Sequence, residues 1–191
     1  KSDNYDDPEV WHLYLEASKL AYTDRGYYIA DAEFVSVPVD NMLDKHYLKE
    51  RSRLINRDST IKNPVRGEFK KYENTNLGID SNSEKPSTTH ISIIDQYGNA
   101  IALTSSIEFM FGSGLMASGF LLNNQLTDFS FYPKDKKGNL IANRPESKKK
   151  PRSSMSPTLV FDPKGKLRMV LGSPGGSRII CYVAASLVRI I

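Results

Sequence analysis

A polar stretch near the middle of the chain separates two parts with different hydrophobic periodicity. Between residues 61 and 87 (IKNPVRGEFKKYENTNLGIDSNSEKPS) the periodicity disappears, and Asn, Ser, Lys, Gly and Pro dominate. This composition is typical of an exposed or disordered connector, and a proteolytic site belongs at its end. We therefore expect a helical part over residues 1–60, a polar connector over residues 61–87 and a β-rich part over residues 88–191.

The part before the connector carries clear helix signals. Asp7 and Pro8 supply an N-cap and a first-turn proline, and apolar residues then recur at helical spacing in EVWHLYLEASKLAY. A second, weaker helix is predicted over residues 39–54. His12 and His46 fall on these segments, and as isolated histidines they are expected at the surface or in packing positions.

The part after the connector reads as strands followed by a helix. TTHISIID and NAIALTSSI, joined by a turn at Gly98, predict one β-hairpin; SPTLVFD and KLRMVLG, joined around Gly165, predict another. A further strand is expected over residues 119–123, and an apolar helix after GSPGGS. The sequence thus predicts an α+β fold.

Composition limits the class of protein. With 191 residues and 39% hydrophobic content the chain is long enough for one domain with a core, and it has no apolar run of membrane-spanning length. It begins without an initiator methionine or a secretory signal and stops within a helical pattern. We expect an internal fragment, inactive in isolation, whose localisation stays open. The single cysteine, Cys181, cannot form an intramolecular disulfide and is expected to be buried and inert.

The net charge of +4 arises from one segment and not from a distributed basic surface. Aromatic residues are not interleaved there, so a solvated loop is favoured over a nucleic-acid site. Three scattered histidines and one cysteine give no zinc pattern, and no cofactor is predicted. A serine-hydrolase G-x-S-x-G elbow is also missing. The basic residues of the segment are Lys134, Lys136, Lys137, Arg144, Lys148, Lys149, Lys150 and Arg152.

Thr88 is a candidate nucleophile, because it lies where the connector meets the first predicted strand. Cleavage before Thr88 would place its hydroxyl beside its own α-amine, a base whose pKa is about 7.7–8.0. A β-branched threonine at the start of a strand also fits ordinary strand propensity. Gly175 and Gly176, at a turn from strand to helix, would offer backbone N–H groups to an oxyanion, although a plain tight turn explains them equally well.

Five motifs of the chain resemble, in order and spacing, the γ-glutamyltranspeptidase family of N-terminal-nucleophile hydrolases. They are TTHISIIDQYGNAIALTSS, FGSG, GFLLNNQLTDFSF, PRSSMSPTLV and GSPGGSRII. Upstream, EASKLAYTDRGYYIADAEFVSVPVDNML is similar to the end of the family's large subunit. The resemblance implies a four-layer αββα sandwich and a proenzyme that cuts itself, here at Ser87–Thr88, into a large and a small subunit.

The resemblance also assigns residues. Thr88 matches the nucleophile, and Ser106 matches a supporting hydroxyl. Asp128, with Gln125 beside it, matches the carboxylate that binds the α-amino group of the donor. The remaining matches are the donor-carboxylate pair Ser153 and Ser154, and the oxyanion-hole pair Gly175 and Gly176. The implied reaction is γ-glutamyl transfer or hydrolysis, from donors such as glutathione to water or an acceptor amine, without a cofactor.

One position departs from the family pattern. Glu108 stands where these enzymes usually carry asparagine, and an ionised glutamate only accepts hydrogen bonds and repels a nearby carboxylate. A cephalosporin-acylase-like amidohydrolase with another acyl donor therefore stays open, as does an unprocessed, non-catalytic domain. The family's carboxylate-binding arginine lies upstream of the residues matched here. Residues 132–152 correspond to its lid over the donor pocket, for which the composition supports mobility.

Overall fold

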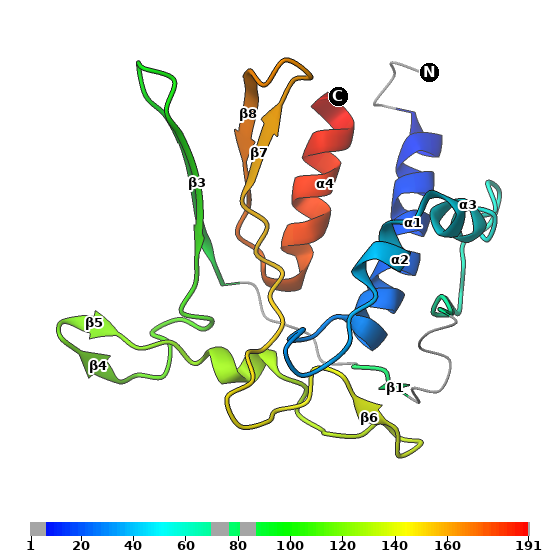
Figure 1. The fold of residues 1–191 in the computed structure, drawn as a ribbon, viewed down its shortest axis with the longest axis horizontal. Coiled ribbons are helices and arrows are strands. Elements are labelled where there is room, and N and C mark those ends of the chain that lie inside the picture. Colours follow the sequence, from blue (N-terminus) through cyan, green and yellow to red (C-terminus); the bar gives the residue numbers. More distant parts are fainter. Residues whose placement is uncertain (1–6, 70–76, 81–86, 191) are drawn as a thin grey trace. The chain divides into compact units, whose positions relative to one another are not determined.

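The computed structural model describes residues 7–69, 77–80 and 87–190 and combines helices with strands (Figure 1). Residues 70–76 and 81–86 of the predicted connector lie outside the described residues. The chain forms two compact units. Unit 1 comprises Lys1–Asn82 and Phe129–Arg152, and unit 2 comprises Ser83–Asp128 and Ser153–Ile191.

Two of the helices of unit 1 begin at aspartate caps. The predicted first helix is confirmed as α1 (Pro8–Tyr28), where the Asp7 carboxylate accepts a hydrogen bond from Glu9 N at 2.8 Å. The second predicted helix is instead two helices, α2 (Val39–Leu43) and α3 (Lys45–Ser52). Asp44 separates them because it has an extended backbone and caps α3 through Tyr47 N.

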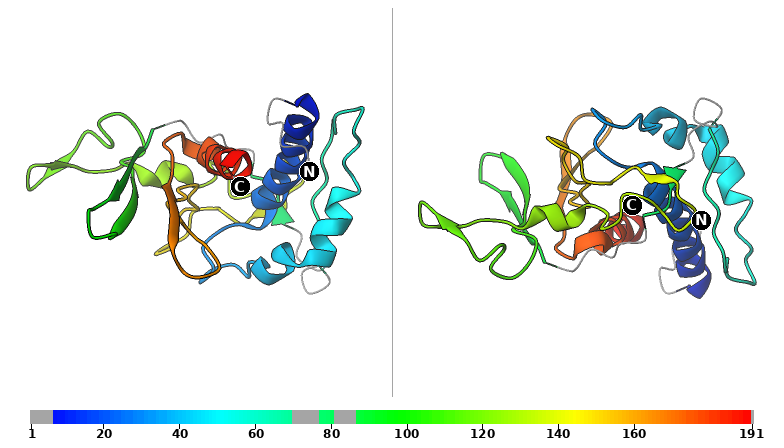
Figure 2. Two further views of the ribbon diagram at one scale, coloured as in Figure 1. Left: turned by 90° about the horizontal axis from the view of Figure 1, so that it is seen from above. Right: turned by 90° about the horizontal axis from the view of Figure 1, so that it is seen from below.

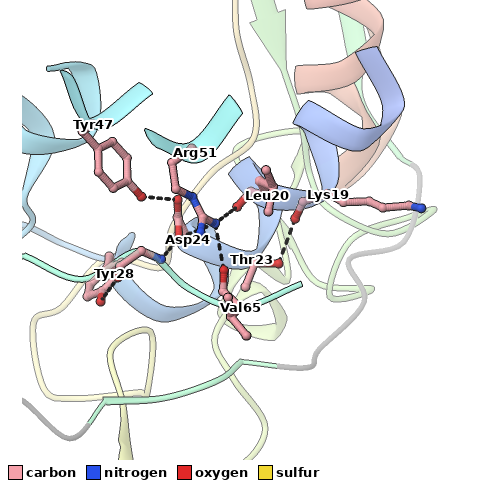
Figure 3. Close-up of polar contacts among 9 residues, drawn as sticks. Lys19, Leu20, Thr23, Asp24, Tyr28, Tyr47, Arg51 and Val65 are labelled. Carbon is pink, nitrogen blue, oxygen red and sulfur yellow. Dashed lines mark hydrogen bonds and ion pairs between the residues drawn. The ribbon is translucent and has the colours of Figure 1, made fainter. Parts of the chain in front are cut away.

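A buried carboxylate on α1 holds unit 1 together (Figure 3). Asp24 is 3% exposed and accepts hydrogen bonds from the Tyr47 hydroxyl at 2.6 Å and from Gly67 N at 2.7 Å. Arg51 pairs with the same carboxylate at 3.3 Å and also donates to Val65 O. Burial raises the pKa of the Tyr47 hydroxyl, and the hydrogen bond to Asp24 raises it further. Asp24 thereby ties α1 to α3 and to the start of the connector.

The connector is not an exposed segment throughout. Phe69 and Leu77 are buried with Tyr28 and Ala142 in the apolar core of unit 1. Short strand β1 (Leu77–Gly78) pairs in parallel with β6 (Leu140–Ile141). The expectation of exposure is therefore wrong for these residues, because a few well-placed apolar side chains pack even where no periodicity marks them. The buried connector residues are Gly67, Phe69, Leu77, Gly78 and Asp80.

The basic segment is also only partly solvated. Lys136 and Lys137 are exposed as predicted, but the Lys149 side chain is fully buried. Its Nζ donates to Ala142 O at 2.7 Å and to Glu146 at 2.8 Å. Arg152 is 7% exposed. The prediction of a solvated loop is wrong at Lys149 and Arg152, since the buried Ala142 carbonyl and the buried Asp80 carboxylate, respectively, offset the cost of leaving water.

Unit 2 contains both predicted hairpins. β2 (Thr89–Ile94) pairs antiparallel with β3 (Ala100–Ser105), and β7 (Thr158–Phe161) with β8 (Leu167–Leu171). Strands β2 and β3 both contact β8. Gly98 has φ +86 in the first turn, as the tight connection requires.

Shorter elements complete unit 2. β4 (Met116–Ala117) pairs with β5 (Phe120–Leu121), which lies within the strand predicted over residues 119–123. Two 3₁₀ helices follow, η2 (Gln125–Asp128) and η3 (Gly176–Arg178). The predicted terminal helix is α4 (Ile179–Ile190), beside the β7–β8 hairpin (Figures 1 and 2).

None of the described helices is both long and apolar enough to cross a membrane. Cys181 on α4 is half-buried, so the expectation that it is buried is wrong. Among the other residues singled out, His12 bonds Asn56 O at 2.8 Å and His46 is exposed. These histidines therefore take the surface positions expected of them.

Candidate functional site

A narrow pocket in unit 2 brings together side chains that are far apart in the sequence. Thr88, which directly precedes β2, is half-buried at its edge. Every site residue predicted from the sequence borders this pocket except Gly175. Its lining consists of Ser87, Thr88, Ser106, Glu108, Gln125, Asp128, Ser153, Ser154, Met155, Gly176 and Ile179.

Two hydroxyls converge on the carbonyl oxygen of Ser87. Thr88 Oγ1 donates to it at 2.5 Å, and Ser106 Oγ donates to it at 2.9 Å. Ser106 directly follows β3, which pairs with β2, so the sheet register brings this hydroxyl next to the Ser87–Thr88 bond. Glu108 N in turn donates to Ser106 Oγ at 2.9 Å and fixes its orientation. The carbonyl carbon that precedes Thr88 is therefore polarised.

The uncut chain nearly fills the pocket. Its free volume is about 20 Å³ with Ser87 still joined to Thr88. That space suits about one water molecule and excludes an amino-acid-sized ligand. A neighbouring cavity of about 340 Å³ also borders Ser87, Thr88 and Ser106. The Ser87–Thr88 bond thus borders both a small polar pocket and a larger neighbouring one.

Glu108 places a carboxylate at one wall of the pocket. It is only 8% exposed, and its φ of +69 is unusual for a residue with a side chain. Asn124 Nδ2 donates to Glu108 Oε2, while Asn124 Oδ1 accepts from Phe109 N at 2.9 Å. One amide side chain thereby holds both the Glu108 carboxylate and the backbone beside it.

Asn124, which holds the Glu108 carboxylate, was not predicted from the sequence. It lies within the motif GFLLNNQLTDFSF next to Gln125, but no local signal directs its amide toward a glutamate 16 residues earlier. The one available clue was Glu108 itself, because a buried carboxylate needs a donor.

Gln125 and Asp128 share one face of η2. A 3₁₀ helix has three residues per turn, so residues three apart are eclipsed. Gln125 Nε2 donates to Asp128 Oδ2, and both side chains border the pocket. The pocket therefore has a second carboxylate, and this one is oriented by an amide of its own helix.

The serine pair and the glycine pair border the pocket unequally. Ser154 is buried, whereas Ser153 is exposed and its Oγ accepts from Met155 N at 3.1 Å. Gly176 lines the pocket, whereas Gly175 does not border it and has φ +136. A Cβ on Gly175 would lie 2.8 Å from the Tyr182 ring, so this position requires glycine for conformation and for space.

The residues that the structure describes include no group of three or more His, Cys, Asp or Glu side chains arranged to hold a metal ion. The pocket instead contains hydroxyls, two carboxylates and an amide. Hydroxyls and backbone N–H groups suit an anion, and carboxylates suit a cation. Such a set can bind a zwitterionic ligand beside the Ser87–Thr88 bond.

Comparison with known proteins gives consistent matches. Glutathione hydrolase proenzyme of Bacillus subtilis is 38% identical over 182 residues, covering 92% of this chain and 30% of that protein. Acylase ACY 1 proenzyme of a Pseudomonas species is 31% identical, covering 94% of this chain and 29% of that protein. A solved γ-glutamyltranspeptidase from Pseudomonas nitroreducens is 41% identical, with a TM-score of 0.47 over 53% of this chain and 55% of that one.

The chain thus spans about 30% of the length of the proenzyme relatives. The sequence profile of Gamma-glutamyltranspeptidase matches residues 1–191, all of the chain. On these grounds the chain belongs to the γ-glutamyltranspeptidase family.

Proposed function

We propose that this chain is the part of a γ-glutamyltransferase or glutathione hydrolase proenzyme that surrounds its processing site. Self-cleavage at Ser87–Thr88 makes Thr88 the N-terminal nucleophile. The observation that carries the proposal is the pair of hydroxyls on the Ser87 carbonyl oxygen, at the edge of a pocket with two carboxylates.

The proposed cleavage has two steps. Thr88 Oγ1 forms a bond to the Ser87 carbonyl carbon, the C–N bond breaks, and the hydroxyl proton passes to the released amine. Water then hydrolyses the resulting ester to a Ser87 carboxylate and the Thr88 hydroxyl. Ser106 stabilises the developing charge on the Ser87 oxygen because its hydrogen bond is already formed.

The mature enzyme repeats this chemistry on a substrate. The α-amine of Thr88 takes the hydroxyl proton while Oγ1 attacks the γ-amide of the donor, and that proton then leaves with the departing amine. The N–H group of Gly176, the member of the predicted oxyanion pair that borders the pocket, stabilises the oxyanion. The acyl group finally passes from Thr88 to water or to an acceptor amine.

Donor recognition follows from the charges in the pocket. Among the ion pairs of the described residues none involves Glu108, although this side chain is buried. A substrate ammonium between Glu108 and Asp128 would supply the missing cation, and Ser153 and Ser154 would donate to the substrate α-carboxylate. This arrangement favours a γ-glutamyl donor over an acyl group without an amine.

An acylase remains the second candidate, supported by the 31% identity to an acylase proenzyme. An acyl group that carries only a carboxylate would be repelled by Glu108 and Asp128. Comparing turnover of a γ-glutamyl anilide with that of a glutaryl amide separates the two functions. Equal or faster glutaryl turnover would refute the γ-glutamyl proposal.

The experiment that tests processing is mass spectrometry of the full-length protein. We expect two fragments that meet at Ser87 and Thr88, and a single intact chain for Thr88→Ala. Wild-type protein that stays intact while folded, or a Thr88→Ala variant that still matures, would refute the mechanism.

For the fold we propose the four-layer αββα sandwich, with the two hairpins of unit 2 as parts of its sheets.

A further inference from the structure

Unit 1 is built from chain on both sides of the proposed cut. Its first part ends at Asn82, before the Ser87–Thr88 bond, and its second part, Phe129–Arg152, follows that bond. Strand β1 pairs with β6 across this division, and Leu77 shares the apolar core with Ala142. Cleavage would therefore leave unit 1 as a body of two chains without a covalent link at this point.

Asp80 makes a deeply buried polar contact across the division. Its carboxylate pairs with Arg152 Nη2 at 3.2 Å, and the two side chains are 1% and 4% exposed. Asn143 Nδ2 donates to the same oxygen at 3.2 Å. Asn143 Oδ1 accepts in turn from Arg152 N at 3.0 Å, which closes a small network. Asp80 comes from before the proposed cut, and both partners come from after it.

Other contacts hold the same two stretches in register. Asp31 accepts from Lys150 N at 2.8 Å, and this hydrogen bond lowers the pKa of the Asp31 carboxyl. A Cβ on Gly78 would lie 2.7 Å from Asn139 O, so β1 sits too close to the second stretch for any side chain. The network at Asp80 is therefore one of several contacts between the part of unit 1 before the proposed cut and the part after it.

We propose that the Asp80–Arg152–Asn143 network is the clamp that keeps the large fragment attached to residues 129–152 of the small fragment after cleavage. This inference rests on the proposed function, since it concerns the two products of self-cleavage. Removing one member of a buried ion pair leaves a charge without compensation, and this costs far more than losing a surface pair. The clamp thus binds one specific partner, the other product of the same precursor.

The test measures how fast the fragments of processed full-length protein separate in moderate urea, by size-exclusion chromatography. We expect Asp80→Ala to speed separation by about 100-fold or more, because it removes the carboxylate that pairs with the buried Arg152 guanidinium. The double variant Asp80→Ala/Arg152→Met removes both charges and should recover most of the loss. A matched control is Glu50→Ala, which removes an exposed ion pair to Arg53 that lies entirely before the cut and which should separate like wild type.

A second arm makes the outcome independent of self-cleavage. In full-length Thr88→Ala protein, a protease recognition sequence replaces residues 83–86 and is cut by added protease before the same measurement. If the wild-type protein fails to mature, the proposed function fails but this arm still tests the clamp. Asp80→Ala fragments that separate within about threefold of the wild-type rate, or no faster than those of Glu50→Ala, would overturn the inference.

Discussion

Loss of the Ser106 hydroxyl should slow self-cleavage without unfolding the precursor. Ser106 Oγ lies 2.9 Å from the Ser87 carbonyl oxygen, on which negative charge develops as Thr88 attacks. Removing one preorganised donor to an oxyanion costs about 2.7–4 kcal/mol, or about 10²–10³ in rate. Because Thr88 Oγ1 bonds the same oxygen only before it attacks, it cannot replace the Ser106 donor in the transition state.

The assay follows maturation of Ser106→Ala by mass spectrometry of samples taken over time after synthesis. Ser106→Thr keeps the hydroxyl and should mature at a rate close to wild type. Melting temperatures of both variants, each in the Thr88→Ala background, show whether the fold is retained. Maturation of folded Ser106→Ala within about threefold of wild type would refute the reasoning, because the hydrogen bond would then contribute nothing to the barrier.

Three further perturbations have defined outcomes. Asp24→Asn removes the charge that pairs with Arg51 at a site where both side chains are buried. It should lower the free energy of unfolding, measured by urea titration, by about 3 kcal/mol. An unchanged free energy of unfolding would contradict this. Hydrogen bonds from Lys19, Ile61 N and Thr60 lower the pKa of Glu16 from 4.5 to about 2. The stability that the ionised Glu16 carboxylate contributes to the fold should therefore be complete above pH 4.5 and be lost as the pH falls toward 2. Acid titration of the Glu16→Gln variant should not show this loss. Asn124→Ala removes the hydrogen bond that holds the Glu108 carboxylate. It should raise KM for a γ-glutamyl anilide by about tenfold with little change in maturation. An unchanged KM would exclude a role for Asn124 in orienting Glu108.

Local signals in the sequence predicted most of the secondary structure. Asp7 and Pro8 gave the start of α1, because cap chemistry depends only on neighbouring residues. The turns at Gly98 and Gly165 gave both hairpins for the same reason. The break at Asp44 was missed, although an aspartate there is itself a capping signal, because the apolar pattern continues across it.

The burial of residues that pair with a distant part of the chain could not be predicted from the sequence. Asp80 and Arg152 are 72 positions apart, and each looks like an ordinary charge in a polar segment. Pattern methods weigh neighbouring residues, so they assign a dense basic run to solvent and cannot detect a partner elsewhere in the chain. The site was predictable to a greater degree, but only through the family resemblance; from the residues alone Thr88 and the glycine pair had ordinary structural explanations.

Unit 1 consists of two stretches that are separated in the sequence, and this affects how it folds during synthesis on the ribosome. Leu77 cannot complete its hydrophobic contacts until Ala142 has been translated, 65 residues later. At about 5–20 residues per second that interval lasts several seconds, and the emerged helices must wait for it with apolar surface uncovered. A nascent chain of this protein is therefore expected to need chaperone protection in that interval.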